Sequence, residues 1–271
     1  MNTYILQALS SVHVGEGTAI GAVGLPIARE RHTGWPIIPG SSIKGALRAR
    51  GGLVGLSTDQ ILAAFGSEPG DTPLKPGGIR FGGASILALP VRCLRGTFAL
   101  LTCPLALARL ARVLPGAPPI PDPSLERALL HPAMKDRFVI SGQQAEYIVI
   151  EELSWIPVAD DDTAAWADWL EQWLGKEAPL RHLVIVHDDV FGHASRFWTP
   201  TRTRAAIGAD GVVEDGKLFT VESLPPETLL WGQLASTGAL NNALPDAGES
   251  WGLGGHRTTG SGRVAWYWRT T

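Results

Sequence analysis

The chain has 271 residues, of which 45% are hydrophobic and 18% are charged, and its formal net charge is −3. This composition excludes a disordered chain and supplies enough apolar residues for the core of one large domain. The net charge alone argues against a nucleic-acid partner, but the charges are unevenly spread. Residues 1–50 hold five basic and two acidic side chains, residues 151–171 hold seven acidic and no basic ones, and 18 of the 23 basic residues are Arg. Because Arg makes forked contacts to phosphate, a nucleic-acid partner stays open.

The two cysteines, Cys93 and Cys103, are too few for a four-cysteine zinc site and predict buried, reduced thiols. The first fifteen residues carry no basic side chain and no apolar block, so no signal peptide is predicted. No apolar run approaches the roughly twenty residues that a membrane span needs. We therefore expect a cytoplasmic protein without a membrane partner.

The first part of the chain alternates strand-like and helix-like segments. Residues 3–13 are apolar on both faces at period two, which predicts a central strand. A helix is predicted to begin with Ser41 as its N-cap, and a short second helix is predicted over 59–65. Residues 79–91 are predicted to form the next strand.

Two further helices are predicted from capping residues, with Thr102 before one and Asp162 before the other. The second carries tryptophans at helical spacing, which favours a core face over a base-stacking platform. An irregular stretch rich in Arg and Thr is expected to end at Glu222. Later strands are predicted over 182–187, 228–234 and 262–268.

Helices interleaved with strands and a late hairpin predict an α+β fold, with a split βαβ sheet of the ferredoxin or RNA-recognition type. Two segments are too rich in Pro and Gly for regular structure. We expect loops or insertions at about 66–78 and 115–145.

The segment Pro39 to Arg48 (PGSSIKGALR) combines a helix start with hydroxyls and cations. Lys44 would fall in the first helical turn, where the dipole disfavours a cation, and Lys44 and Arg48 would repel each other on one face. A bound anion removes both penalties, so a phosphate site is one interpretation. A capped helix with solvated charges is an equally strong one. A nucleotide-binding P-loop is excluded, because Ala46 and Leu47 stand where it needs Lys and Ser or Thr.

Two glycine-rich segments add to this polar signal. His13 begins the first (HVGEGTAIG) at a strand end, where a His suits acid–base chemistry, a phosphate contact or simple packing. For His13 taken alone, packing is the favoured interpretation. The second segment (GLGGHRTTGSGR) has five glycines among residues 252–263 together with His256, Arg257 and Arg263. Such a segment lets the backbone approach a polyanion closely, and a surface turn is the alternative.

Five stretches in this order, HVGEGTAIG, LPIARERHTGWPIIPGSSIKGALR, FGGASILALPVRCLRGTF, VESLPPETLLW and LGGHRTTGSGRV, carry a resemblance to a known family. The chain resembles the RAMP superfamily of CRISPR proteins, and more narrowly the backbone subunit of the Cmr (type III-B) effector complex. The resemblance runs from residue 3 to residue 268, interrupted by the Pro-rich loops.

The resemblance implies a single RAMP domain over 1–271, with a ferredoxin-like palm and a β-hairpin thumb at about 199–222. It implies copies that polymerise along CRISPR RNA, pair it with complementary target RNA and assemble with other Cmr subunits. In such proteins the helix start and the glycine loop hold the guide backbone, while the thumb displaces a base. The RNA-binding residues expected on this chain are His13, Ser41, Ser42, Lys44, Arg48, Arg202, Arg204, Ile207 as the apolar wedge, Gly254, Gly255, His256, Arg257, Thr258 and Arg263.

The chain departs from the family where target cleavage is expected. Gly24 stands where these subunits carry an Asp, in the loop after the first strand, and Gly83 stands at a second carboxylate position. Glycine supplies neither a metal ligand nor a base, so we expect weak or absent target cleavage with RNA binding retained. No catalytic residue is assigned, and a divalent metal is expected only if cleavage is retained. His13, Glu16, Glu30 and Glu222 remain as substitutes, although Glu30 and Glu222 are more simply explained as partners of Arg or backbone groups.

Two alternatives remain open. One is an active RAMP endoribonuclease, which either cuts target RNA or processes precursor RNA by metal-free chemistry with His13. The other is an interaction module that does not bind RNA, which would account for the acidic net charge. A strong dependence of RNA affinity on salt would argue against that module.

Overall fold

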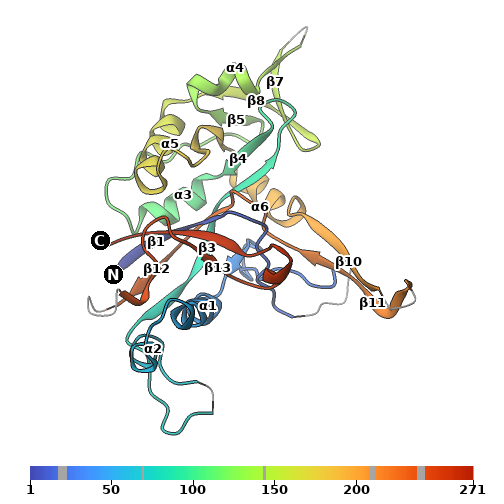
Figure 1. Cartoon of the computed structure of the whole chain (residues 1–271). Coiled ribbons are helices and arrows are strands. Elements are labelled where there is room, and N and C mark those ends of the chain that lie inside the picture. The colour runs from blue at the N-terminus through green and yellow to red at the C-terminus, as the bar shows by residue number, and fades with distance from the viewer. Residues whose placement is uncertain (18–22, 69, 143–144, 208–210, 237–241, 271) are drawn as a thin grey trace.

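The structure is a computed structural model that describes residues 1–17, 23–68, 70–142, 145–207, 211–236 and 242–270. One long mixed sheet and a separate two-stranded hairpin form its framework (Figure 1). This combination of a mixed sheet with separate helices confirms the predicted α+β class. Within the described residues, no helix is long and apolar enough to cross a membrane.

The long sheet has the order β13-β14-β1-β12-β3-β4-β9-β5-β8-β7-β6, with β2 paired to β3. Every residue of β1 is buried between β12 and β14, which confirms the predicted central strand but shortens it to Asn2–Ala8. The strands are β1 (Asn2–Ala8), β2 (Ile37–Ile38), β3 (Arg80–Arg92), β4 (Phe98–Thr102), β5 (Arg127–Leu130), β6 (Ile140–Ser141), β7 (Glu146–Ile150), β8 (Leu153–Ala159), β9 (Leu183–Ile185), β12 (Leu229–Ala235), β13 (Ser250–Gly252) and β14 (Arg263–Thr270).

Helices α1 (Gly40–Leu53) and α2 (Thr58–Phe65) cover one face of the sheet, below it in Figure 1. Their apolar side chains, including Ile43 and Leu47, pack in a core cluster with β1, β12 and β14. The predicted N-cap at Ser41 is wrong, because α1 begins at Gly40 and no side chain caps it. A Cβ at Gly40 would lie 2.5 Å from the carbonyl oxygen of Phe81, so the helix starts in close contact with β3. Ser41 therefore lies inside the first turn, where its hydroxyl is exposed.

Helices α3 (Pro104–Ala111) and α5 (Asp161–Leu174) pack in another core cluster, on the other part of the sheet. The predicted cap at Thr102 is wrong, because Thr102 ends β4 and donates its hydroxyl to the carbonyl of Leu87 at 2.6 Å. The predicted cap at Asp162 is also wrong. The N-cap is Asp160, two residues before Asp162, and its carboxylate accepts a hydrogen bond from the amide of Thr163. The tryptophan stripe faces the core as expected, with the side chain of Trp166 fully buried.

Residues 115–123 form neither helix nor strand, but the wider range 115–145 is more than a loop. Within it, β5 pairs in parallel with β8 and antiparallel with β9, so it belongs to the main sheet. The short helix α4 (Lys135–Phe138) and β6 also fall in this range. Helix α6 (Asp188–Phe197) occupies a stretch that the sequence indicated to be irregular.

A separate hairpin, β10 (Thr201–Ile207) with β11 (Val213–Glu222), lies in the range expected for a thumb. It extends away from the body of the molecule, to the right in Figure 1. The expected wedge, Ile207, ends β10 opposite Val213, and its side chain is outside the described part of the structure.

Candidate nucleic-acid interface

A groove of about 530 Å³ is lined by three segments that are far apart in the sequence. They are the stretch that follows β1, one face of α1, and the glycine-rich loop between β13 and β14. The lining residues are His13, Val14, Gly15, Gly17, Leu25, Ser42, Gly45, Ala46, Ala49, Gly252, Gly254, Gly255 and Arg257. Glycine and alanine predominate, so backbone atoms are accessible along much of this groove.

The glycine loop packs directly against the backbone of His13. The amide of Gly255 donates to the carbonyl of His13 at 2.9 Å. Gly254 has a φ of +83°, and a Cβ there would lie 2.3 Å from the same carbonyl oxygen. Both the left-handed backbone and the close approach require glycine at 254. The second glycine-rich segment is therefore a packed loop that forms one wall of the groove.

The ring of His13, which lines the groove, lies beside the ring of His256, with the two centroids 5.4 Å apart. The Nδ1 atom of His13 lies 2.6 Å from the carbonyl oxygen of Glu222. Because a carbonyl only accepts, Nδ1 carries the proton and Nε2 is left for another partner. Desolvation, the nearby Arg204 and the nearby His13 all hold the pKa of His256 below its ordinary value. His256 can therefore gain a proton when an anion binds beside it.

The sequence-predicted residues of α1 divide between two neighbouring faces. Ser42 lines the groove, whereas Ser41, Lys44 and Arg48 line an adjacent pocket of about 480 Å³. Gly45 borders both, so the two hollows meet over the exposed side of the helix.

The two cations of this pocket differ in how they are held. Arg48 donates to the carbonyl of Gly66 and forms an ion pair with Glu68 at 3.4 Å. Within the described residues, the side chain of Lys44 has neither a hydrogen bond nor an ion pair. Lys44 is therefore the more available of the two for a phosphate.

The hairpin reaches the glycine loop through Arg204, which donates to the hydroxyl of Thr259 at 3.1 Å. Arg257 extends over Gly252 into the groove, and Thr258 is exposed beside it. Arg202 is exposed on β10. Arg263 does not line the groove, because its guanidinium is held by the Ser250 hydroxyl.

Gly24 lies at the base of the hairpin, where the amide of Leu25 donates to the carbonyl of Thr220 at 2.9 Å. A Cβ at Gly24 would meet the Thr220 backbone at 3.7 Å, which is ordinary van der Waals contact. Gly24 also lacks a positive φ. The backbone at this position therefore accepts a larger residue without rearrangement.

The carboxylates considered as substitutes are mostly engaged. Glu222 is 5% exposed, and its carboxylate accepts from Arg29, from Thr199 at 2.5 Å and from the amide of Ile27 at 3.0 Å. Glu30 accepts from Arg109 at 3.0 Å and from Thr33 at 2.8 Å. Glu16 is exposed. Among the described residues, no group of three metal-ligating side chains comes together.

The interpretation of Glu222 and Glu30 as partners of Arg or backbone groups is confirmed, but the sequence did not indicate which residues those partners are. Arg29 donates to Glu222 and to the carbonyls of Gly34 and Ser195 at 2.7 and 2.8 Å, and so joins the hairpin to the end of α6. These contacts join residues up to 193 positions apart in the chain, so no local sequence pattern indicates them.

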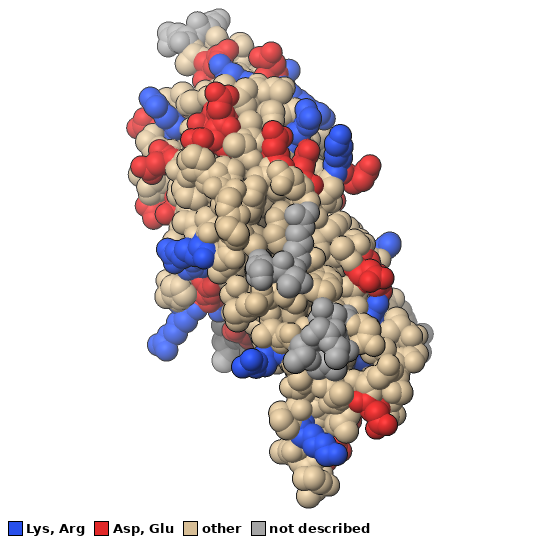
Figure 2. Space-filling model, turned by 90° about the vertical axis from the view of Figure 1, so that its left-hand side faces the viewer, with Lys and Arg blue, Asp and Glu red and all other residues tan. Residues whose placement is uncertain are grey.

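Most of the acidic segment 151–171 forms β8 and α5, in the upper part of Figure 1, whereas the hairpin lies to the right. Glu151 and Glu152 differ, because they line a pocket together with Thr199 to Thr201 at the start of the hairpin. Figure 2 shows acidic side chains gathered mainly over the upper part of the face that it views.

The family model described as "RAMP superfamily" matches residues 5–265, nearly the whole chain. The chain belongs to the RAMP superfamily. The resemblance seen in the sequence is thereby confirmed, and the groove described above is a feature of a RAMP fold.

Several relatives narrow the placement within the RAMP superfamily. The protein named "CRISPR system Cmr endoribonuclease Cmr4" from Pyrococcus furiosus is 32% identical over 290 aligned positions, which cover 97% of this chain and 95% of that protein. A crystal structure of oligomeric Cmr4 from Pyrococcus furiosus has a TM-score of 0.75 and 26% identity, and the match covers 99% of this chain and 97% of that one. A type III-B Cmr-beta structure bound to cognate target RNA has a TM-score of 0.74 at 19% identity, with 98% of this chain and 96% of that one covered, and supports the fold alone. This RAMP protein is thus a relative of the Cmr4 backbone subunit of type III-B complexes.

Proposed function

We propose that this RAMP protein coats CRISPR guide RNA as a repeated, filament-forming subunit of a type III-B effector complex. The observation that carries the proposal is the groove, whose described lining combines glycine backbone, the Ser42 hydroxyl, His13 and Arg257 without a base-reading amide. Such a lining suits phosphate and ribose, and it leaves sequence recognition to base pairing. The oligomeric state of the Pyrococcus relative supports assembly of copies along the guide.

The finer parts of the proposal follow the family resemblance. The central sheet acts as a ferredoxin-like palm and the β10–β11 hairpin as a thumb, with Arg202 and Arg204 holding phosphates and Ile207 displacing a base. Complementary target RNA then pairs with the exposed guide, and other Cmr subunits join the ends of the filament. Arg204 supports this role for the hairpin, because it already lies against the glycine loop.

Target cleavage by this subunit is proposed to be absent. The position of the usual Asp is Gly24, and the carboxylates of the buried Glu222 and the half-buried Glu30 are held by arginines. A carboxylate that balances a buried Arg is not free to bind a metal ion or take a proton. The Pyrococcus relative is named an endoribonuclease, so the two proteins are proposed to differ in this activity.

The test reconstitutes the chain with a guide RNA and a labelled complementary RNA in the presence of Mg²⁺ or Mn²⁺. The native chain is compared with Gly24→Asp and with the matched variant Gly24→Asn, which has the same size but no carboxylate. We expect binding by all three proteins, and regularly spaced cuts only with Gly24→Asp. Equal cutting by the native chain would contradict the proposal, and His13, Glu16 and Glu30 would be replaced next.

A second candidate function is favoured by the pair of histidines. Two imidazoles 5.4 Å apart beside Arg257 suit metal-free strand scission. One imidazole takes the proton of a ribose 2′-hydroxyl, the 2′-oxygen attacks the adjacent phosphorus to form a 2′,3′-cyclic phosphate, and the 5′-oxygen leaves with a proton from the other imidazole. Cleavage of unpaired precursor RNA in the presence of EDTA, lost in His13→Gln, would support this candidate. Intact RNA under those conditions would exclude it.

A further inference from the structure

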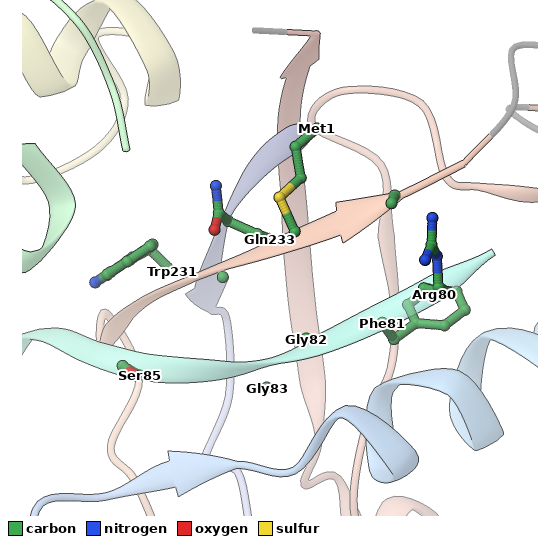
Figure 3. A pocket seen from close by; sticks show the side chains of 10 residues that line it. Met1, Arg80, Phe81, Gly82, Gly83, Ser85, Trp231 and Gln233 are labelled. Carbon is green, nitrogen blue, oxygen red and sulfur yellow. The ribbon is translucent and has the colours of Figure 1, made fainter. Parts of the chain in front are cut away.

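A second hollow, of about 610 Å³, lies on the sheet face opposite α1. Along β12, Leu230 and Leu234 join the core cluster that includes α1, whereas Trp231 and Gln233 point to the other face. Figure 3 shows Trp231, Gln233 and Arg80 spread along β12 and β3, with Met1 between Gln233 and Arg80 and with Gly82 and Gly83 on the β3 ribbon below them. This pocket is therefore separated from the groove by the sheet itself.

The floor of the pocket is bare backbone. The register between β12 and β3 shifts between Gly232 and Leu234, so that Gly82 and Gly83 of β3 lie opposite the single residue Gln233. The extra residue of this bulge therefore belongs to β3. A Cβ at Gly82 would lie 2.7 Å from the carbonyl oxygen of Gln233, so the bulged strand requires glycine there.

The Ser85 hydroxyl of the pocket already donates to the Glu30 carboxylate at 3.3 Å, so the polar side chains that remain for a ligand are those of Arg80 and Gln233. Among the described residues, the side chains of Arg80 and Gln233 have neither a hydrogen bond nor an ion pair. None of the described side chains that line the pocket is a carboxylate, so Arg80 gives the lining a positive charge, with the Glu30 carboxylate reached only through Ser85. The surroundings therefore favour an anionic ligand.

Trp231 supplies a flat apolar wall at one end of the pocket. Its indole is half-buried against a core cluster, and its nitrogen points away from the pocket in Figure 3. The part of the ring that faces the pocket is therefore apolar, which suits stacking of a planar ligand. Sheets that bind single-stranded RNA use exposed aromatic rings in the same way.

The geometry points to a binding site for one nucleotide on this open sheet face. The base stacks on Trp231, the amide of Gln233 contacts the edge of the base, and Arg80 holds the phosphate. A protein partner is disfavoured, because only Met1, Phe81 and Trp231 are large apolar lining residues, too few for the core of a stable interface. The site stands independently of the guide groove.

The nucleotide can be free or part of a single-stranded RNA, and one photo-crosslinking experiment distinguishes the two sources. The full chain is irradiated with a six-nucleotide RNA that contains 5-iodouracil, and separately with 5-iodouridine monophosphate. Adducts are then located by mass spectrometry of peptides. We expect an adduct on Trp231 with the hexamer. The same yield at the same concentration of the monophosphate would assign the site to free nucleotides.

Variants in and out of the pocket sharpen the result. Arg80→Gln is expected to lower the Trp231 adduct about tenfold, because it removes the phosphate contact. Arg127→Gln, at another exposed arginine on a strand, is expected to leave the adduct unchanged. Arg257→Glu is expected to remove adducts from the groove only, so failure of the guide proposal and failure of this one give different peptides.

Three outcomes would overturn the proposal. One is the absence of an adduct on Trp231 with both probes, and another is an equal yield in Arg80→Gln and the native chain. The third comes from sedimentation of the RNA-free chain: if Arg80→Gln weakens self-association there, the pocket is a contact between copies.

Discussion

The hairpin base around Glu222 and the groove with its adjacent pocket use basic side chains in opposite ways. At the hairpin base, Arg29, Thr199 and Glu222 satisfy one another, and the Glu222 side chain is only 6% exposed. Arg257 in the groove and Lys44 in the adjacent pocket have no counter-ion among the described residues. The first arrangement stabilises the fold, and the second is available to a ligand.

This difference separates structural residues from binding residues without reference to any relative. A buried ion pair with all its hydrogen bonds made has nothing left for RNA, and loss of one partner destabilises the protein. An unpaired surface cation contributes little to folding but attracts phosphate. Substitutions should therefore change stability at one region and RNA affinity at the other.

The largest expected effect is on stability, at Glu222. Glu222→Ala should lower the free energy of unfolding by about 3–5 kcal/mol, because it leaves the Arg29 charge buried without its partner. Urea unfolding followed by circular dichroism measures the change. Glu222→Gln, which keeps hydrogen-bonding atoms at the same place, should lose less, and Glu16→Ala, at an exposed position, should lose almost nothing. Equal losses in Glu222→Ala and Glu16→Ala would show that the cluster is not structural.

The next effect is on assembly, at Lys44. Lys44→Glu should reduce RNA affinity by about tenfold or more and abolish RNA-dependent assembly, because it places a negative charge at a phosphate position. The melting temperature of the monomer should stay within a degree or two of the native value. Filter binding and sedimentation measure the two properties. Arg48→Gln is the comparison, and its effect should be smaller because Arg48 is already held by Glu68. An unchanged assembly in Lys44→Glu would move the guide site away from α1.

A smaller effect concerns salt. The logarithm of RNA affinity should fall linearly with the logarithm of salt concentration, and Arg257→Gln should reduce that slope by about 0.7, which corresponds to one phosphate contact. Titrations at several salt concentrations measure both slopes. A native affinity that hardly changes with salt would contradict phosphate binding and favour the alternative of a module that does not bind RNA.

The smallest effect concerns pH, at His256. The pKa of His256 is lowered in the free protein, and a neighbouring phosphate would raise it. RNA affinity should therefore rise a few-fold as pH falls through the pKa of the bound state, and level off below the pKa of the free state. His256→Gln should remove this part of the pH dependence. Arg204→Gln should shift the rise to higher pH, because one cause of the lowered pKa is gone.

The contiguous sequence motifs predicted parts of the site correctly, because each motif forms one continuous segment of it. The run Pro39 to Arg48 does form the start of a helix beside the groove, and residues 252–263 do form the loop opposite it. Local patterning also identified the central strand and the buried face of α5, since alternation and helical spacing report burial directly.

Several other features could not be predicted from the sequence, because contacts between residues far apart in the chain determine them. Which face of α1 meets the groove is decided by packing of Ile43 and Leu47 against the sheet, and this assigns Ser42 rather than Lys44 to the lining. Helix α6, in which Phe191, Ala194 and Ser195 are buried, was missed although its apolar and polar residues are separated onto two faces. The cap positions were misplaced by one or two residues because tertiary contacts, such as that of Gly40 with β3, decide where each helix begins.

The position of β1 has a consequence for how the chain acquires its structure on the ribosome. β1 ends at Ala8, but its neighbours β12 and β14 begin at Leu229 and Arg263. A strand that is apolar on both faces is therefore synthesised more than two hundred residues before either partner exists. Such long-range pairing is slow and leaves an aggregation-prone segment exposed during translation. A nascent chain of this protein should accordingly depend on a holding chaperone until β14 has emerged, and truncation before β14 should yield insoluble product.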